Sequence, residues 1–289
     1  MVVREALAGT PLALVEDLVL EADCADVLAR LPEGSFELIY IDPPFNTGSV
    51  RRHSRTQARR DEDGSHVGFG GNRYRTSQGA SMGYADSYED YVGFLAPKLT
   101  RARELLAPEG TLYVHLDYRE AHYAKVALDA IFGRECFLNE IVWAYDYGAK
   151  PTRRWPAKHD TILVYVRDPK LHLFDAEAVE REPYMAPGLV SAEKAARGKR
   201  PTDTWWHTIV PTSGSERTGY PTQKPEGVLR RIVAASSRPG GWCLDFFAGS
   251  GTLGAVCAQL GRRYVLVDSN PQAIEVMRLR LGVEPARLI

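Results

Sequence analysis

The sequence predicts an α/β protein built on a doubly wound, mostly parallel β-sheet. Short runs of β-branched, aromatic and apolar residues are typical of buried strands, and segments with helical periodicity lie between them. This alternation favours parallel strands joined by helices that cover both faces of the sheet. With 289 residues, the chain is long enough for one large domain of this kind and a smaller appended lobe.

Strands and helices can be assigned in chain order. The segments expected to be strands are Phe36 to Asp42, Thr111 to Asp117, Thr161 to Asp168, Trp242 to Phe247 and Tyr264 to Asp268. Helices are expected over Tyr91 to Leu106 and over His122 to Phe132, because apolar residues recur on one face of each segment. Several of the strands end in an acidic residue, so the sheet is expected to present carboxylates at the ends of its strands.

Two segments interrupt the alternation. Ser49 to Ser87 is rich in Gly, Ser and Arg and has little periodicity, so we expect a long loop that is functional or partly disordered. Tyr145 to Tyr220 contains one clear strand among many Pro, Gly, Arg and aromatic residues. It is expected to form an inserted lobe.

Charge and cysteine content narrow the class of protein. The formal net charge is -1, but basic residues are in excess in Arg51 to Arg75, Lys150 to Lys170 and Lys194 to Arg238, so one face of the molecule can still bind nucleic acid. The four cysteines are scattered without metal-ligand spacing, which indicates neither a zinc site nor a disulfide framework and favours the reducing cytoplasm. The sequence shows no signal peptide and no apolar run long enough to span a bilayer.

A glycine loop near the C-terminus predicts a nucleotide-binding βαβ unit. It runs from Cys243 to Gly254 and is followed by a strand that ends at Asp268, where a carboxylate can hold the hydroxyls of a ribose. The glycines also match the pattern of nicotinamide dehydrogenases. Two features count against that class: few residues follow Asp268, and Asp245 precedes the loop. A carboxylate at that position suits a sulfonium amino acid better than a pyrophosphate.

The sequence Asp42-Pro43-Pro44-Phe45 follows the first predicted strand. Two prolines hold this turn stiff at the carboxyl end of the strand, the edge at which open α/β sheets bind ligands. An exocyclic amino group of a base is a poor nucleophile that needs hydrogen-bond acceptors. The Asp42 carboxylate and the Pro43 carbonyl can serve as these acceptors, and Phe45 can stack on a base that has left the duplex.

Together these motifs resemble the β class of DNA amino-methyltransferases from bacterial modification systems, in which the catalytic tetrapeptide comes first and the cofactor loop last. DPPF at 42–45 resembles the catalytic motif, DFFAGSGT at 245–252 the cofactor motif, and ERTGYPTQKP at 216–225 the segment that precedes the cofactor half. Val114 to Tyr118 resembles a family segment behind the catalytic turn, so His115 and Asp117 are expected to be supporting residues. The resemblance implies a Rossmann-like, seven-stranded methyltransferase sheet of permuted strand order, with an inserted target-recognition lobe.

The resemblance also implies domain boundaries and a binding site. It assigns 20–145 to the catalytic half, 146–219 to target recognition and 220–289 to the cofactor half. The residues expected to bind S-adenosylmethionine are Asp23, Lys224, Asp245, Phe247, Gly249, Gly251, Thr252 and Asp268, with the lysine near the methionyl carboxylate. The cations expected to contact DNA are Lys150, Arg153, Arg154 and Lys158. Trp155, Trp205 and Trp206 are expected to be buried, and no metal is required.

The expected activity is methyl transfer to double-stranded DNA, with the N6 amino group of adenine favoured over the N4 group of cytosine. An RNA or protein amino-methyltransferase remains an alternative, as do the dehydrogenase and a DNA-binding module without activity. The sequence leaves open whether the protein forms a homodimer, and no motif indicates a partner nuclease.

Overall fold

The computed structural model describes residues 4–6, 11–60, 66–67, 73–146, 148 and 151–288; residues 4–6, 288 and those between 49 and 85 are described by their backbone alone. The chain forms two compact units. One consists of Met1–Phe45 and Asp90–Ile289, and the other is Asn46–Glu89.

The first unit is built on an open, mixed sheet that contains ten strands within the described residues. In their order across the sheet, the strands are β1 (Arg4–Ala6), β13 (Ala286–Leu288), β2 (Leu18–Glu21), β12 (Arg263–Asp268), β11 (Trp242–Asp245), β3 (Phe36–Ile41), β7 (Leu106–Leu116), β9 (His159–Val166), β8 (Phe137–Ala144) and β10 (Thr204–Trp206). Only β9 runs antiparallel to its neighbours, β7 and β8. The prediction of a mostly parallel sheet is therefore confirmed.

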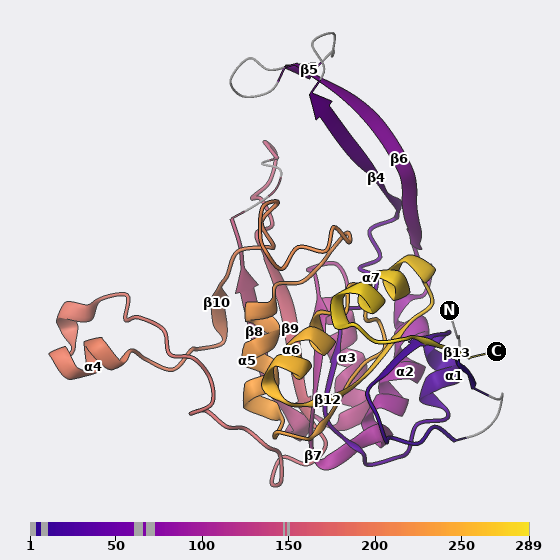
Figure 1. Cartoon of the computed structure of the whole chain (residues 1–289). Coiled ribbons are helices and arrows are strands. Elements are labelled where there is room, and N and C mark those ends of the chain that lie inside the picture. The colour runs from indigo at the N-terminus through magenta and orange to yellow at the C-terminus, as the bar shows by residue number, and fades with distance from the viewer. Residues whose placement is uncertain are drawn as a thin grey trace. The chain divides into compact units, whose positions relative to one another are not determined.

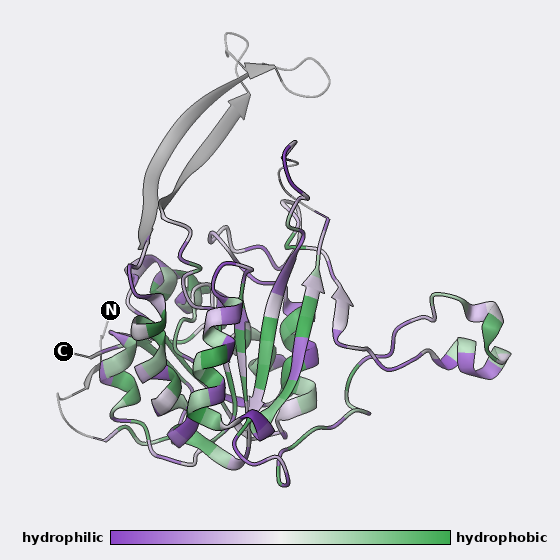
Figure 2. Cartoon of the chain, turned by 180° about the vertical axis from the view of Figure 1, so that it is seen from behind, coloured by the Kyte–Doolittle hydropathy of each residue, from purple (hydrophilic) through white to green (hydrophobic). Residues whose placement is uncertain are grey.

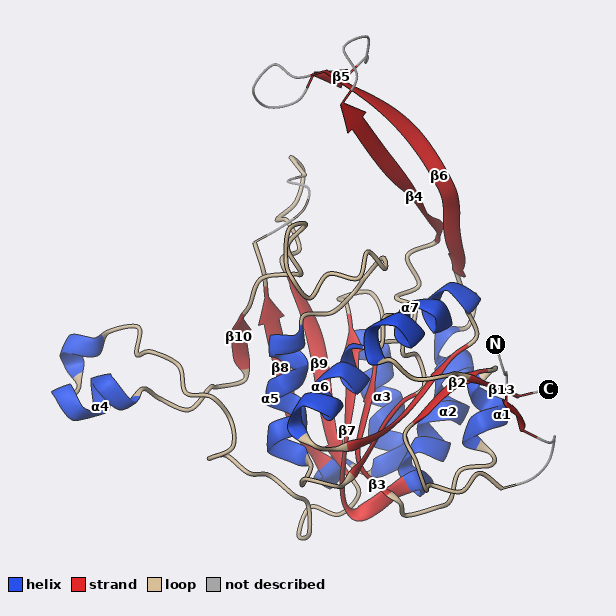
Figure 3. Cartoon of the chain, in the orientation of Figure 1, coloured by secondary structure: helices blue, strands red, loops and turns tan. Residues whose placement is uncertain are grey.

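Helices cover both faces of this sheet, as a doubly wound fold requires (Figures 1 and 3). One layer consists of α1 (Cys24–Leu28), α2 (Tyr91–Leu105) and α3 (Ala121–Phe132). The other consists of α5 (Glu226–Ser236), α6 (Thr252–Leu260) and α7 (Pro271–Leu281). Shorter pieces are η1 (Arg134–Cys136), η2 (Pro187–Leu189) and α4 (Ala192–Arg197). No described helix is both long enough and apolar enough to cross a membrane.

The core lies between the sheet and the two helix layers, and the central strands are accordingly hydrophobic (Figure 2). Tyr264 to Val267 of β12 are at most 3% exposed, which explains why this strand reads as a continuous apolar run instead of an alternating one. Because β2, β12, β11 and β3 are parallel neighbours, their carboxyl ends meet at one edge of the sheet. This edge brings Asp23, Asp42, Asp245 and Asp268 together from distant parts of the chain.

Three short strands at or next to the edges of the sheet account for the difference between the seven strands implied by the resemblance and the strands observed. β1, β13 and β10 have three residues each. Strands this short carry too little pattern to be recognised in a sequence. β7 also begins earlier than predicted, at Leu106, directly after α2.

The second unit is an antiparallel hairpin, so the prediction of a long loop over 49–87 is wrong. β4 (Ser49–Arg60) pairs with β6 (Arg73–Asp86), and β5 (His66–Val67) adds to β6. The register shifts between Ser54 and Thr56, which marks a β-bulge. Polar residues fill both sets of alternating positions in these strands, so the sequence lacks the apolar alternation by which a half-buried strand is recognised.

The segment 146–219 does not form one separate unit. Its strand β9 lies inside the main sheet between β7 and β8, and β10 extends the same sheet at its edge. Both faces of β9 are covered, because Asp160 to Val166 are all buried. The remainder, between these two strands, is a long connection that contains α4 and is mostly exposed.

Candidate active site

The Asp42-Pro43-Pro44-Phe45 turn follows β3 at the edge where the parallel strands end. Asp42 Oδ2 forms an ion pair with Lys224, and Lys224 Nζ lies 4.8 Å from the centre of the Phe45 ring. Asp42 Oδ1 is buried and has no hydrogen-bond partner among the described residues. The two oxygens of this carboxylate therefore differ: one is neutralised by an ammonium group, and the other is an acceptor without a donor.

The glycine loop joins β11 to α6 beside this turn. Gly249 and Gly251 have φ of 50° and 70°, and a Cβ on Gly251 would lie 2.7 Å from Met277 Cγ, so the loop needs glycine at this position. Asp268, at the end of β12, accepts hydrogen bonds of 2.8 Å from the backbone N–H groups of Gly249 and Asn270. It thereby fixes the loop to the neighbouring strand. The structure thus brings Gly249 and Asp268 together, and their binding of a cofactor stays a prediction.

Asp245 and Asp268 give the site its electrostatic character. Burial raises the pKa of Asp245 well above its usual value; the charges of Asp42 and Asp268 raise it further, while the Phe247 N–H and Lys224 oppose the shift. Burial also raises the pKa of Asp268. A ligand that carries positive charge relieves this repulsion between carboxylates. The site therefore fits S-adenosylmethionine, which carries a sulfonium and an ammonium group, while Lys224 suits its carboxylate.

Asp23 caps α1 at the same edge, where its side chain accepts a hydrogen bond of 2.8 Å from Ala25 N–H. The preceding residue, Ala22, donates its N–H to the Asp268 carbonyl at 3.2 Å. Asp23, expected from the sequence to bind the cofactor, therefore lies next to the strand end that carries Asp268.

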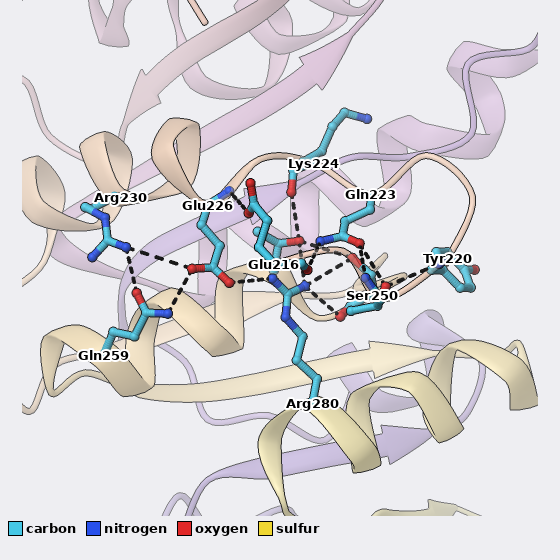
Figure 4. A network of polar contacts seen from close by, with 11 residues as sticks. Glu216, Tyr220, Gln223, Lys224, Glu226, Arg230, Ser250, Gln259 and Arg280 are labelled. Atoms are coloured by element: carbon cyan, nitrogen blue, oxygen red, sulfur yellow. Dashed lines mark hydrogen bonds and ion pairs between the residues drawn. The ribbon is translucent and has the colours of Figure 1, made fainter. Parts of the chain in front are cut away.

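A polar network fixes Lys224 relative to the glycine loop (Figure 4). The Thr252 hydroxyl donates to the Lys224 carbonyl at 3.1 Å. Arg280, from α7, donates to the Ser250 carbonyl and to Thr252 Oγ1, each at 3.1 Å, and its other nitrogen donates to Glu226 at 2.7 Å. The segment that carries Lys224 and the start of α6 are thus held by the same guanidinium.

A second group of polar side chains lies behind the catalytic turn. His115 is fully buried and hydrogen-bonds through its two ring nitrogens to Tyr40 and Asp160, at 2.8 and 3.1 Å. The expectation that His115 supports the site agrees with this position. Asp160 was not predicted from the sequence, because it lies just before the apolar run that marks β9. Asp117, the other expected supporting residue, accepts hydrogen bonds from the backbone and side chain of Arg119.

A family model described as DNA methylase, for N6 and N4 methyltransferases, matches residues 36–278. The chain is 30% identical over 257 residues to the type II methyltransferase M.HpaI of Haemophilus parainfluenzae, covering 89% of this chain and 71% of that protein. It is 26% identical over 273 residues to the DNA adenine methyltransferase YhdJ of Escherichia coli K12, covering 92% and 82%.

The chain belongs to the DNA methylase family. Solved structures share its fold. The complex of M1.HpyAVI with S-adenosylmethionine has a TM-score of 0.59 at 19% identity and covers 92% of this chain and 99% of that one. The cytosine-N4-specific PvuII DNA methyltransferase has a TM-score of 0.63 at 13% identity and covers 96% and 89%.

This DNA methylase uses S-adenosylmethionine and acts on the amino group of adenine or cytosine in DNA. The family membership removes the dehydrogenase, the RNA or protein methyltransferase and the inactive binding module from consideration. It does not distinguish between the two bases.

The residues expected to contact DNA lie partly on the surface of the DNA methylase. Arg153 and Arg154 are exposed, and Lys158 is half-buried and donates to the Gly148 carbonyl at 2.9 Å. Lys150 lies outside the described residues.

The prediction that three tryptophans are buried is correct only for Trp205, which is 7% exposed. Trp155 and Trp206 are 94% and 72% exposed, so the prediction is wrong for both. Trp155 follows Arg154 directly in an irregular segment whose residues 151–155 are all exposed.

Proposed function

We propose that this DNA methylase modifies the N6 amino group of adenine in double-stranded DNA, with the target base turned out of the helix against the Asp42-Phe45 turn. The observation that carries the proposal is the buried, unpartnered oxygen of Asp42. An acceptor in that state is suited to an amino N–H donor. The relative named as an adenine methyltransferase supports adenine as the base.

Methylation of the amino group needs hydrogen-bond acceptors, because the lone pair of the amino nitrogen is delocalised into the ring. In this proposal Asp42 Oδ1 and the Pro43 carbonyl accept the two N–H bonds, which favours a pyramidal nitrogen with its lone pair free. Phe45 stacks on the base and offsets part of the cost of unstacking it, about a few kcal/mol. S-adenosylmethionine supplies an electrophilic methyl group on a positively charged sulfur. Asp42 Oδ1 then accepts the proton that the methylated nitrogen releases.

Lys224 has a defined part in this proposal. Its ammonium group holds Asp42 Oδ2 and leaves Oδ1 as the oxygen that can accept from a base. The remaining residues of the expected cofactor pocket are Asp23, Phe247, Gly249, Gly251, Thr252 and Asp268.

Two basic segments are proposed to contact the duplex. Arg153, Arg154, Lys158 and the unburied Trp155 combine cations with an aromatic ring, and we extend this group to Lys150. In the hairpin, residues 49–60 and 73–85 contain seven arginines and no acidic residue. Arg59 lies opposite Arg75 in the register of β4 and β6. Target recognition is accordingly assigned to 146–219 together with the hairpin.

Cytosine is the second candidate base, since it also presents an amino group beside a ring nitrogen and the PvuII enzyme of the same fold acts on cytosine. Transfer of labelled methyl from S-adenosylmethionine to unmethylated bacterial DNA, followed by nucleoside digestion and mass spectrometry, separates the two. N6-methyladenine supports the proposal, whereas a product that contains only N4-methylcytosine contradicts it.

The role of Asp42 is tested by Asp42→Ala in the same assay. We expect the rate of methyl transfer to fall by about 100-fold or more, because the amino group loses its charged acceptor. The affinity for S-adenosylmethionine, measured by calorimetry, should change little. A variant that methylates DNA at the normal rate would show that Asp42 has no part in the reaction.

A further inference from the structure

A continuous chain of buried polar groups crosses three strands behind the catalytic turn. The Tyr40 hydroxyl on β3 lies 2.8 Å from His115 Nδ1 on β7, and His115 Nε2 lies 3.1 Å from Asp160 Oδ2 on β9. The chain ends at the Tyr145 hydroxyl, which donates to Asp160 Oδ1 at 3.0 Å. Tyr40, His115 and Asp160 are all buried, so each of these hydrogen bonds replaces contacts with water.

The protons in this chain can be assigned from the chemistry of its ends. Burial would raise the pKa of Asp160, but the hydrogen bond from His115, helped by the charge of Lys224 and the hydrogen bond from Tyr145, lowers it below its usual value. Asp160 is therefore ionised and can only accept, so His115 Nε2 carries a proton. Burial raises the pKa of Tyr40, so its hydroxyl stays protonated and can donate to Nδ1. Every polar atom in the chain then has a partner, which fixes one tautomer of His115.

His115 is held in place from several sides. In addition to its two hydrogen bonds, its ring packs edge-on against Trp143, with centroids 5.4 Å apart. The ring is fully buried and so has no access to a substrate. An Asp-His-Tyr series of this kind could be a nucleophile and its base, but the burial of the imidazole excludes that role. The function of the chain must pass through a neighbour that does reach the site.

That neighbour is Phe45. The centroids of the Phe45 and His115 rings lie 5.9 Å apart, with an angle of 41° between their planes. Phe45 is half-buried, and its ring also contacts the ammonium group of Lys224, which is itself paired with Asp42. The orientation of the His115 ring thus defines the surface against which the Phe45 ring rests.

We propose that Asp160 is a positioning residue for methyl transfer: through His115 it fixes the ring of Phe45 against which the target base stacks. The proposal rests on the assignment of Phe45 as the stacking residue in the proposed function, but it does not depend on which base is modified. It gives β9, the antiparallel strand of the sheet, a direct part in the reaction.

The proposal is tested with Asp160→Ala, Asp160→Asn and Tyr40→Phe. Asp160→Ala leaves His115 Nε2 and the Tyr145 hydroxyl without an acceptor. Asp160→Asn keeps an oxygen for His115 and should restore most of the activity. Tyr40→Phe removes the other hydrogen bond of the imidazole and is the informative variant if Asp160→Ala fails to fold. Tyr113→Phe is the matched control. Tyr113 lies on β7, the strand next to β3, and the substitution deletes a buried tyrosine hydroxyl that hydrogen-bonds Ser236 at 2.8 Å.

The measurements are the single-turnover rate of total methyl incorporation into DNA, the calorimetric affinity for S-adenosylmethionine, and the fluorescence of 2-aminopurine placed at the modified position. We expect Asp160→Ala to slow transfer by about tenfold or more, since small misplacements of reacting groups cost up to about 100-fold. We expect a weaker fluorescence increase and an unchanged cofactor affinity. Tyr40→Phe should give a smaller effect of the same kind, and Tyr113→Phe should give none.

Coupling to Phe45 provides the decisive comparison. If Asp160 acts through Phe45, adding Asp160→Ala to a Phe45→Ala enzyme should slow transfer little further. Additive losses in the double variant would overturn the proposal, as would wild-type rates in Asp160→Ala and Tyr40→Phe. A parallel loss of cofactor affinity would also overturn it, because it would indicate a general structural role. Because total methyl incorporation is measured, a product with methylated cytosine would contradict the proposed base without affecting this test.

Discussion

At the scale of single residues, the contacts of Lys224 in the structure differ from the role that the sequence motifs indicate for it. The resemblance assigns it to the cofactor's carboxylate, whereas the structure pairs it with Asp42 and places it over Phe45. The two roles are compatible, because an ammonium group has three protons to donate. Lys224 thus connects the catalytic motif with the cofactor motif.

Lys224→Met should therefore impair two measurable quantities. Hydrogen bonds to charged groups contribute about 1.5–3 kcal/mol, so we expect the rate at saturating S-adenosylmethionine to fall by about 10-fold to 100-fold. The cofactor's KM should also rise. In an Asp42→Ala background the effect on the rate should largely disappear while the effect on binding persists. An unchanged rate at saturation would restrict Lys224 to the cofactor.

Asp245 gives the site a defined pH dependence. Burial raises its pKa, and the nearby charges of Asp42 and Asp268 raise it further. A positively charged ligand favours the ionised form, so the affinity for S-adenosylmethionine should fall as the pH is lowered through this raised pKa and level off above it. Calorimetry between about pH 5 and 8 tests this dependence.

Asp245→Asn is the control for that measurement and should show a weaker, flatter affinity profile. Whereas Asp245→Asn should weaken cofactor binding, it should increase the stability of the folded protein at neutral pH. Because the folded-state pKa is raised, the stability that this group contributes at low pH is lost as the pH rises through the folded-state pKa. At neutral pH we therefore expect Asp245→Asn to raise the Tm of the ligand-free protein, by about 2–4 °C for each kcal/mol relieved. A lower Tm would contradict this interpretation of the burial of Asp245.

The sequence indicates individual site residues where a local motif surrounds them. Asp42 precedes two prolines, and Asp245 precedes a glycine loop, so each has a recognisable context. Asp160 has none: an acidic residue next to a strand is common, and its partners Tyr40, His115 and Tyr145 are distant in the chain or separated from it by an irregular segment. Only the three-dimensional arrangement shows that these groups are joined.

At the scale of elements, the connection between the 216–226 segment, the glycine loop and α7 depends on Arg280. Its side chain is 9% exposed and bridges Glu226, Ser250 and Thr252 (Figure 4). Arg280→Lys replaces the planar guanidinium group by a single ammonium group, which cannot reach all three partners. We expect a cofactor KM several-fold higher, with a kcat close to that of the wild type.

Arg278→Lys is the matched control. It lies on the same helix and bonds only Glu275 through hydrogen bonds of 2.8 Å at the surface, where ion pairs contribute about 0–1 kcal/mol. Steady-state kinetics of both variants separate the two cases. Equal KM values for Arg280→Lys and the wild type would show that the network does not organise the loop.

Elements were predictable where burial imposes a pattern. β3, β7, β9, β11 and β12 are the central strands, and their apolar runs identify them. The hairpin of β4 and β6 was not predictable, because polar residues fill both sets of alternating positions in its strands. The short strands β10 and β13 pair with the longer strands β8 and β2, and β1 pairs with β13; no local signal in the sequence records these pairings.

At the scale of the whole molecule, Asn46–Glu89 is a separate compact unit, and the chain on either side of its hairpin can be joined by a short link. Ser49 pairs with Asp86, and Gly48 donates its N–H to the Asp86 carbonyl at 2.9 Å, so the two ends of the hairpin lie side by side. Residues 49–86 can therefore be replaced by two glycines. We expect the shortened enzyme to fold and to keep its affinity for S-adenosylmethionine.

DNA affinity should fall in the shortened enzyme, and its dependence on salt should become shallower. Each phosphate contact contributes about -0.9 to the slope of log K against log salt concentration, and the removed strands carry seven arginines. Fluorescence anisotropy with duplex DNA over a range of salt concentrations measures both quantities. An unchanged slope would show that the hairpin does not contact phosphates.

The pairing of β11 with β3 has a consequence for synthesis of the protein. β3 carries the catalytic turn and β11 the cofactor loop, and they are neighbours in the sheet although roughly 200 residues separate them in the chain, a length that a ribosome makes in about 10–40 s. Until β11 emerges, one edge of β3 has no strand to pair with, and exposed apolar edges promote aggregation. A nascent or truncated chain that ends before β11 also lacks the methyl-donor site, so DNA can be methylated only after the segment with β11 and the glycine loop has been synthesised.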